Sequence, residues 1–318
     1  MTESAWWWPI ASQGDDLSQP HAVTLLGRSL VLWQAQDHTV SLLNDRCPHR
    51  GAQLSLGQVH GNALQCPYHG WRFGPQGQCQ HIPSQPDFVP PASTAVRSHQ
   101  LQSAHGLWWA SLDGKAHQPL PELSTLPGRR LVYGPFDVAT SAPRAVENFL
   151  DTSHFAFVHE GWLGDARHPE VPAHEVTWSP DGRPVVEHYL AWQPRASATA
   201  SEGAWVTYRY EVLSPFAALL TKRSTTDGPE DSYVIWACPQ TPETCRLWFA
   251  QYTTDEMSSE ETLRNFQVEI FSQDQPVLES QQPKRLPLTG GECMVASDRL
   301  SVAYRKYLKQ VNITFAVC

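Results

Sequence analysis

Cys47-Pro-His49-Arg-Gly and Cys66-Pro-Tyr-His69-Gly-Trp are the two stretches that decide the fold of this chain. Together they read C-x-H, a spacer of sixteen residues, and C-x-x-H. Two thiolates and two imidazoles in paired arms are the ligands of a [2Fe–2S] cluster in which two histidines replace two cysteines on one iron. Because imidazoles carry less negative charge than thiolates, such a cluster has a potential of roughly −150 to +300 mV. The motif therefore predicts a carrier of single electrons at moderate potential.

A structural zinc site is the main alternative for these four ligands. Zinc fingers place both cysteines in one arm and both histidines in the other. Here each arm holds one cysteine and one histidine, together with its own proline and glycine. Such backbone breakers predict hairpin-like tips that hold one cluster from the same side, so we favour the cluster over zinc.

The composition is that of a globular protein with room for two domains. The chain has 318 residues, of which 41% are hydrophobic and 17% charged. The net charge is −9 and no run of Lys or Arg occurs, so nucleic acid and anionic membranes are not expected partners. No apolar stretch is long enough to span a membrane, and the first residues do not resemble a signal peptide.

Cysteine usage points to a reducing compartment. Seven cysteines are present, and the two expected cluster ligands leave five at irregular spacing. An odd number without regular spacing is not a disulfide framework. We therefore expect a cytoplasmic protein.

Short apolar runs separated by turn residues predict β-strands in residues 23–43 and 107–112. We expect residues 1–116 to form a small all-β domain and the Pro-rich residues 117–128 to form a linker. In residues 129–318, helices are expected at 143–151, 258–282 and 298–310, with strands at 184–193, 204–213, 232–238 and 246–253. This order predicts an α+β domain in which an antiparallel sheet curls around a long helix.

A second metal motif lies in the expected helix at 143–151 and just beyond it. Asp151, His154 and His159 read D-x-x-H-x4-H. Two histidines and a carboxylate form the facial triad of non-haem Fe(II) oxygenases, which leaves positions open on the metal. Residues five apart lie about 140° apart around an ideal helix, so the helix must end or kink before His159. Asp151 and His154 are three apart and would share a helical face.

The third ligand is expected from the long helix at 258–282. Asp274 lies on its apolar stripe, and an inward carboxylate needs a metal or a cation as partner. Glu279 and Asp255 are weaker candidates because they leave the stripe. Alternatively, Pro276 breaks the helix and Asp274 is an exposed cap.

These motifs resemble those of the α subunits of Rieske non-haem iron oxygenases, over almost the whole length. The quoted arms, the segment Asn148–His159 and the segment 274–282 carry the resemblance. Size and domain order are similar to the homotrimeric branch that includes vanillate demethylase-type monooxygenases. Residues 153–165, 281–288 and 297–308 look like those of saxitoxin-pathway hydroxylases.

The resemblance implies a Rieske domain followed by a helix-grip catalytic domain. It implies a [2Fe–2S] cluster on Cys47, His49, Cys66 and His69, and a mononuclear Fe(II) on His154, His159 and Asp274. Asp151 would link an iron histidine to a cluster histidine of the next subunit, and Asn148 would be a polar neighbour of the iron. The resemblance further implies a homotrimer served by an NAD(P)H-dependent reductase of flavin or ferredoxin type.

The expected function is a monooxygenase that uses O2 to hydroxylate a C–H bond of a small molecule, with a saxitoxin-like guanidinium alkaloid as one substrate. The first alternative is oxidative O- or N-demethylation, or hydroxylation, of a small aromatic compound. The second is a Rieske electron carrier with a ligand-binding domain that does no catalysis. Loss of His154, His159 or Asp274 would have pointed to the carrier, and all three are present.

Overall fold

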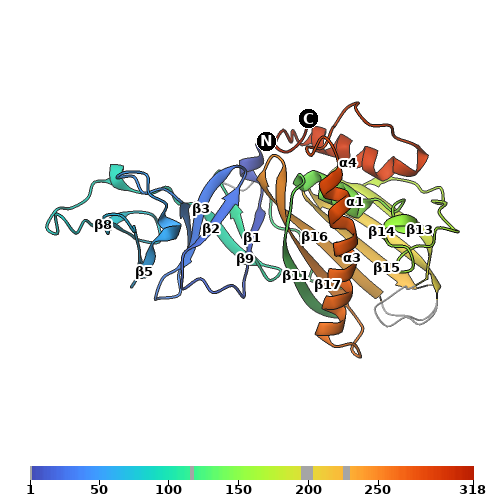
Figure 1. Ribbon diagram of the computed structural model, residues 1–318, viewed down its shortest axis with the longest axis horizontal. Helices are drawn as coiled ribbons and strands as arrows, with labels where there is room; N and C mark the ends of the chain where they lie inside the picture. Colours follow the sequence, from blue (N-terminus) through green and yellow to red (C-terminus); the bar gives the residue numbers. More distant parts are fainter. Residues whose placement is uncertain (1, 115–117, 195–202, 225–229) are drawn as a thin grey trace. The chain divides into compact units, whose positions relative to one another are not determined.

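The computed structural model describes residues 2–114, 118–194, 203–224 and 230–318. It divides into two units, Thr2–Leu120 and Pro121–Cys318. The first consists of strands and short 3₁₀ turns, and the second joins a large antiparallel sheet to helices (Figure 1). The expected α+β class, with the all-β domain first, is confirmed. The expected bounds 1–116, 117–128 and 129–318 stay predictions, and residue 117 lies outside the described residues.

Three small antiparallel sheets make up the first unit. One sheet has the order β1-β10-β9, the second β2-β3-β4 and the third β5-β6-β7-β8. The strands are β1 (Trp8–Ser12), β2 (His21–Leu25), β3 (Arg28–Gln34), β4 (Val40–Asn44), β5 (Gln58–His60), β6 (Ala63–Gln65), β7 (Arg72–Phe73), β8 (Cys79–His81), β9 (Gln100–Ala104) and β10 (Leu107–Ser111). The strands expected in residues 23–43 and 107–112 are confirmed, whereas β5–β9 are too short and polar to have been predicted.

The two cluster-motif cysteines belong to the core of this unit. Cys47 and Cys66 are almost fully buried and share one cluster of buried side chains with Trp33, Leu64 and Phe73. Burying these apolar side chains provides most of the stabilisation available to so small a domain. The motif loops are therefore anchored at their cysteine ends by packing.

The second unit is built on a seven-stranded antiparallel sheet of order β11-β17-β16-β15-β14-β13-β12. Its strands are β11 (Arg129–Val138), β12 (Thr177–Trp178), β13 (Pro184–Gln193), β14 (Ala204–Ser214), β15 (Ala217–Ser224), β16 (Glu230–Thr241) and β17 (Thr244–Thr253). All four strands expected here are confirmed. Strands β11, β12 and β15 were missed. Gly134 and Pro135 interrupt β11, β12 has only two residues, and β15 does not alternate between polar and apolar residues.

Three helices and one isolated turn complete the second unit. They are α1 (Ala142–Leu150), α2 (Phe155–Val158), α3 (Glu260–Ser280) and α4 (Arg299–Gln310). Helix α1 packs on β15 and β16 and also contacts α3 and α4. Helix α3 runs across the face of the sheet (Figure 1), which confirms the expected sheet around a long helix. Among the described residues, no helix is both long and apolar enough to cross a membrane.

Local interactions explain where helix α3 begins, and the helix is not interrupted by its internal proline. Ser259 is its N-cap, and the Ser259 hydroxyl accepts a hydrogen bond from the Thr262 amide at 3.1 Å. Glu260 and Glu261 follow in the first turn, where negative charge is favourable. The helix continues through Pro276 to Ser280. The alternative in which Pro276 ends the helix is therefore wrong.

Candidate metal centres

The two motif loops have matching backbone turns. The Gly51 amide donates to the Cys47 carbonyl at 2.9 Å, and the Gly70 amide donates to the Cys66 carbonyl at 3.1 Å. Both glycines have positive φ, 75° and 69°, which side-chain-bearing residues rarely adopt. These turns are the hairpin-like tips expected from the sequence.

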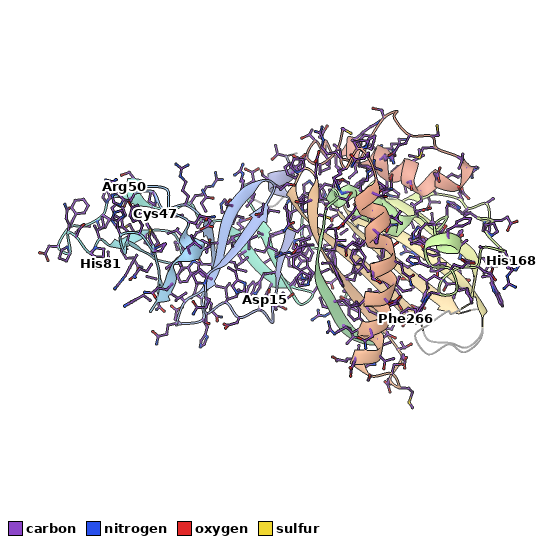
Figure 2. The ribbon with its side chains drawn as sticks, viewed as in Figure 1. Asp15, Cys47, Arg50, His81, His168 and Phe266 are labelled. Carbon is purple, nitrogen blue, oxygen red and sulfur yellow. The ribbon has the colours of Figure 1, made fainter. Side chains whose placement is uncertain are left out.

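The two motif histidines lie side by side on the surface of these tips. Their ring centroids are 4.5 Å apart, and the His49 ring also stacks on Trp71 at 4.7 Å with an angle of 5°. Figure 2 shows Cys47 and Arg50 of the first loop at the end of the domain away from Asp15. The buried thiols and exposed imidazoles thus form a layered donor set at one tip of the domain.

This donor set fits a two-metal cluster better than a single zinc ion. Across the described ranges, three or more His, Cys, Asp or Glu ligand atoms lie within 4.8 Å of one another in one group, which does not include these four residues. A [2Fe–2S] cluster needs its thiolates on one iron and its imidazoles on the other, so the four donors need not meet at one point. In the metal-free protein, burial raises the pKa of Cys47 to about 11, and metal binding must displace that proton.

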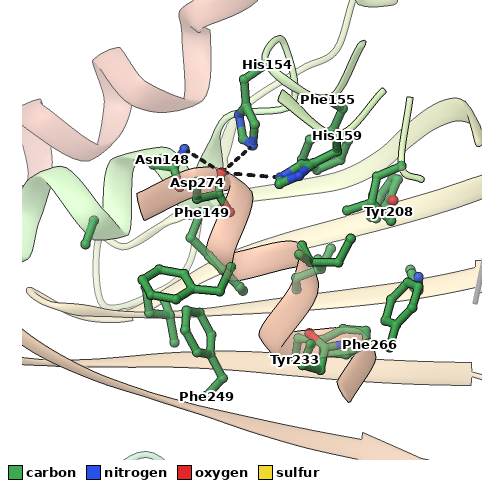
Figure 3. A pocket seen from close by; sticks show the side chains of 18 residues that line it. Asn148, Phe149, His154, Phe155, His159, Tyr208, Tyr233, Phe249, Phe266 and Asp274 are labelled. Carbon is green, nitrogen blue, oxygen red and sulfur yellow. Dashed lines mark hydrogen bonds and ion pairs between the residues drawn. The ribbon is translucent and has the colours of Figure 1, made fainter. Parts of the chain in front are cut away.

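The second group of ligands comes from two different parts of the chain. His154 and His159 are the residues that flank the one-turn helix α2, and Asp274 lies on α3. Their ligand atoms all lie within 4.8 Å of one another. The Nε2 atoms of His154 and His159 are 3.4 and 3.3 Å from the same oxygen, Oδ1 of Asp274 (Figure 3). The structure therefore brings the expected triad together.

The helix break demanded by the histidine spacing is present. Helix α1 ends at Leu150, and Asp151 has extended backbone angles, φ −88° and ψ 138°. The prediction that the helix ends before His159 is confirmed. The prediction that Asp151 and His154 share a helical face is wrong, since Asp151 lies outside the helix.

Of the three candidate acids, Asp274, Glu279 and Asp255, only Asp274 faces the histidines. Asp274 is 8% exposed, and its Oδ1 accepts a hydrogen bond from the side-chain amide of Asn148 at 3.3 Å. Glu279 instead accepts from the Ala139 amide, and Asp255 caps the turn before α3 by accepting from the Ser258 amide. These two acids are therefore engaged elsewhere.

Each imidazole of the triad is held by a hydrogen bond at Nδ1, the ring nitrogen that does not face Asp274. Asp151 Oδ2 lies 3.1 Å from Nδ1 of His154, and Gln273 Oε1 lies 2.8 Å from Nδ1 of His159. Asp151 is an anion, because hydrogen bonds from His154 and Ser153 outweigh its burial and lower its pKa. The sequence did not predict Gln273 as a partner of His159. The one feature that could have indicated this role is its position next to Asp274.

This geometry fits a metal ion. Imidazole nitrogen and carboxylate oxygen bind a first-row metal ion such as zinc at about 2.0–2.2 Å, so two ligands at right angles lie about 3 Å apart. The observed separations of 3.3 and 3.4 Å are close to that value. With both Nδ1 atoms already engaged, both Nε2 lone pairs are directed to one point. Two histidines and one carboxylate on one side of a metal form the facial triad.

A cavity of about 100 Å³ opens beside the triad. Its wall is mostly apolar and comes from α1, α2, α3 and four strands of the sheet (Figure 3). The apolar and aromatic lining includes Phe149, Phe155, Leu163, Phe249, Phe266 and Phe271. Such a wall excludes water and suits a small ring, as ligand pockets with few polar groups do.

Comparison with known proteins places this geometry in a family. Residues 7–100 match the Rieske [2Fe-2S] domain, and residues 138–312 match the vanillate O-demethylase oxygenase C-terminal domain. The chain is 33% identical to methylxanthine N1-demethylase NdmA of Pseudomonas putida, covering 92% of this chain and 83% of that protein. It is also 33% identical to methylxanthine N3-demethylase NdmB of the same organism, covering 93% and 84%.

One solved structure and one further relative are also similar to this chain. The solved structure of Pseudomonas putida NdmA with caffeine superposes with a TM-score of 0.83 at 30% identity, covering 97% of this chain and 90% of that one. Oxidoreductase NdmD of Pseudomonas putida is 36% identical over 36% of this chain and 20% of its own length.

The chain belongs to the Rieske non-haem iron oxygenases. It is an oxidoreductase whose cofactors are a Rieske [2Fe–2S] cluster and a mononuclear iron. The alternative of an electron carrier without catalysis is wrong. Which residues hold each cofactor stays a proposal, supported by the two donor sets described above.

Proposed function

We propose that this enzyme is an oxidative demethylase of small aromatic compounds, with N-methylated heterocycles as its first substrate class. The observation that carries the proposal is the meeting of His154, His159 and Asp274 at a mostly apolar cavity. The kinship with two methylxanthine N-demethylases over more than nine-tenths of the chain supports the N-methyl group as the target.

The chemistry divides between the metal and the protein. When bound, the mononuclear iron supplies the activation of O2 for oxidation of the methyl C–H bond. The chain supplies ligands on one side only, through the triad, and a dry aromatic wall that orients a planar ring. Asn148 fixes the Asp274 carboxylate, and Asp151 and Gln273 fix the two imidazoles.

The atoms and electrons balance for demethylation. The N–CH3 group, O2, two electrons and two protons give N–H, formaldehyde and water. One C–H bond becomes C–O, and the hydroxylated methyl group then leaves as formaldehyde, with the N–H proton taken from its hydroxyl. The two electrons come from NAD(P)H through a separate reductase, and the likeness to oxidoreductase NdmD supports such a partner.

The hydroxylation of a guanidinium alkaloid, expected first from the sequence, is less well supported than demethylation. A mostly apolar wall disfavours a cationic substrate, because burial disfavours the charged form of a group. The two relatives that match over more than nine-tenths of this chain, NdmA and NdmB, are demethylases, in agreement with the first alternative.

We propose further that electron transfer runs between subunits of a homotrimer. Asp151 is 28% exposed on its side chain while it holds His154, so an adjacent copy could reach its carboxylate. A cluster-loop histidine of that copy, such as His49 or His69, is exposed and has the matching N–H donor. A head-to-tail contact of this kind closes into a ring.

The test is turnover with a surrogate reductase, NADH, O2 and a panel of N-methylated and O-methylated aromatic compounds. We expect equimolar formaldehyde release and O2 uptake with at least one N-methyl heterocycle, and none with the His154→Ala variant. A hydroxylated product that keeps its methyl carbon, or turnover of guanidinium alkaloids alone, would contradict the proposal.

A further inference from the structure

The two cluster-motif histidines differ from the triad histidines in what surrounds them. In the triad, Asp151 and Gln273 occupy the Nδ1 atoms of the two imidazoles. His49 and His69 are exposed, and across the part of the chain that the structure describes neither imidazole has a hydrogen-bond partner. An exposed side chain without a partner samples several rotamers, and binding a metal removes that freedom. The orientation of these two rings therefore needs another source.

Aromatic rings take the place of hydrogen bonds beside these histidines. The ring centroids of His49 and Trp71 are 4.7 Å apart, and the angle between the two ring planes is 5°. The ring centroids of Tyr68 and His69 are 3.9 Å apart, with an angle of 34°. Because the two imidazoles also contact each other, the four rings form one row in the order Trp71, His49, His69 and Tyr68.

The two ends of this row are anchored differently. Tyr68 is 61% exposed, so few neighbours hold its ring. Trp71 is half-buried and packs against the core cluster that contains Cys47 and Cys66. Flat contact with a ring that core packing already fixes restricts rotation of the His49 ring. Trp71 is thus the member of the row that extends the order of the core to an exposed imidazole.

Trp71 also connects the two motif loops. Its backbone carbonyl accepts a hydrogen bond from the Cys66 amide at 2.8 Å, which closes the second loop. Its indole lies against His49, which belongs to the first loop. One residue therefore contacts the second loop through its backbone and the first loop through its side chain. Since the proposed cluster ligands come in pairs from the two loops, their relative placement decides whether all four can bind one cluster.

We propose that Trp71 is a positioning residue of the Rieske cluster, which acts by holding the His49 imidazole through stacking. The proposal rests on the proposed assignment of His49 as a cluster ligand, and it does not depend on the demethylase function. Stacking fixes the plane of the ring and occupies neither ring nitrogen. One nitrogen can then bind iron while the N–H of the other stays exposed, where a hydrogen bond within the protein would have occupied it.

The test is pulsed electron paramagnetic resonance of the reduced cluster in the purified holoenzyme. Two imidazole ligands give two sets of nitrogen hyperfine couplings, and each set depends on the orientation of its ring. We expect Trp71→Leu to change one set and to speed cluster loss to a chelator about tenfold or more, on the scale of the affinity lost when a neighbour of a metal ligand is removed. Trp71→Phe keeps a flat ring and should retain both sets.

Trp108→Leu is the matched control. Trp108 is also a half-buried tryptophan of the first unit, but it lies on β10, which pairs with β1 and β9. Its loss should lower the unfolding temperature and leave both nitrogen sets and the rate of cluster loss unchanged. If Trp71→Leu yields no holoenzyme, Trp71→Met fills more of the space against the core without a ring, and the same change of one nitrogen set is expected.

The outcomes separate the role of Trp71 from the ligand assignment. His49→Cys should abolish one nitrogen set, and an unchanged spectrum would overturn both the assignment and the proposal. If one set is abolished, unchanged couplings in Trp71→Leu, the same change in Trp108→Leu, or the same change in Trp71→Phe would overturn the role of Trp71 alone. None of these measurements depends on turnover, so the result holds whichever substrate the enzyme oxidises.

Discussion

At the residue scale, the catalytic geometry depends on hydrogen bonds to the far nitrogens of two histidines. Asp151 and Gln273 occupy the Nδ1 atoms, and both Nε2 atoms then point to Asp274. Without those partners each ring could turn about its side-chain bonds, and binding a metal would cost ordering entropy. The proposed ligand set is therefore organised in the protein itself.

Gln273→Leu should weaken mononuclear iron binding about 10- to 100-fold, as loss of such orienting partners does, because His159 is no longer held. The measurement is iron content after dialysis against a weak chelator, with the cluster absorption as internal standard. Gln275→Leu is the matched control, since Gln275 lies on the same helix and its amide donates to Glu279 instead. Equal iron loss from both variants would mean that Gln273 has no special role.

His69→Cys should keep a [2Fe–2S] cluster and lower its potential toward the roughly −400 mV of all-cysteine clusters. The reason is the added negative charge of a thiolate at the metal. Redox titration of the visible spectrum measures the shift. An unchanged spectrum and potential would show that His69 is not a ligand.

The sequence predicts the proposed ligands better than their hydrogen-bond partners. The proposed cluster ligands Cys47, His49, Cys66 and His69 follow from spacing, because each pair lies in one short loop. Gln273 could not be predicted, since its contact with His159 spans 114 residues and depends on how α3 packs.

At the element scale, the ends of α1 and α2 and the continuity of α3 position the triad. Helix α1 must end at Leu150 so that the chain can turn, and α2 is a single turn between the two histidines. Helix α3 must continue through Pro276 so that Asp274 stays inward. The expected helix at 143–151 ended one residue too late, because its pattern does not show that Asp151 adopts an extended conformation.

At the element scale, Gly164 is a position beside the triad where even a methyl group does not fit. The loop after α2 passes so close to that turn that a Cβ at Gly164 would lie 2.4 Å from the Phe155 backbone. Gly164→Ala should therefore cost about 1–3 kcal/mol of unfolding free energy and reduce iron occupancy, because His159 directly follows α2. Thermal unfolding and iron content measure both effects.

Gly14→Ala is the control for this substitution. Nothing lies within 4 Å of a Cβ at Gly14, so its variant should keep wild-type stability and iron content. A Gly164→Ala variant that behaves like this control would show that the loop can move away without disturbing α2.

At the scale of the whole molecule, one chain carries an electron-transfer domain and an oxygenase domain. The fold class and both cofactors could be predicted, because each metal motif is short and specific. The substrate could not be predicted, since the cavity wall is assembled from single residues of α1, α2, α3 and four strands. Positions so far apart in the sequence carry no local pattern.

Asp151→Asn should fold, bind both cofactors and form the same oligomer, but lose most turnover because the path between adjacent subunits is interrupted. Mixed oligomers provide the direct measurement. Chains with Cys47→Ser, lacking the cluster, combined with chains with His154→Ala, lacking the iron, should regain some activity. No activity in verified mixed oligomers would contradict transfer between subunits.

The proposed function requires that His154, His159 and Asp274 hold the iron at which the substrate is demethylated. The most direct measurement is iron stoichiometry together with formaldehyde release for Asp274→Ala, with Glu279→Ala as control. We expect Asp274→Ala to fall from three irons per chain to two, keep the Rieske absorption and release no formaldehyde, while Glu279→Ala keeps all three. Three irons and full formaldehyde release in the Asp274→Ala variant would contradict the claim.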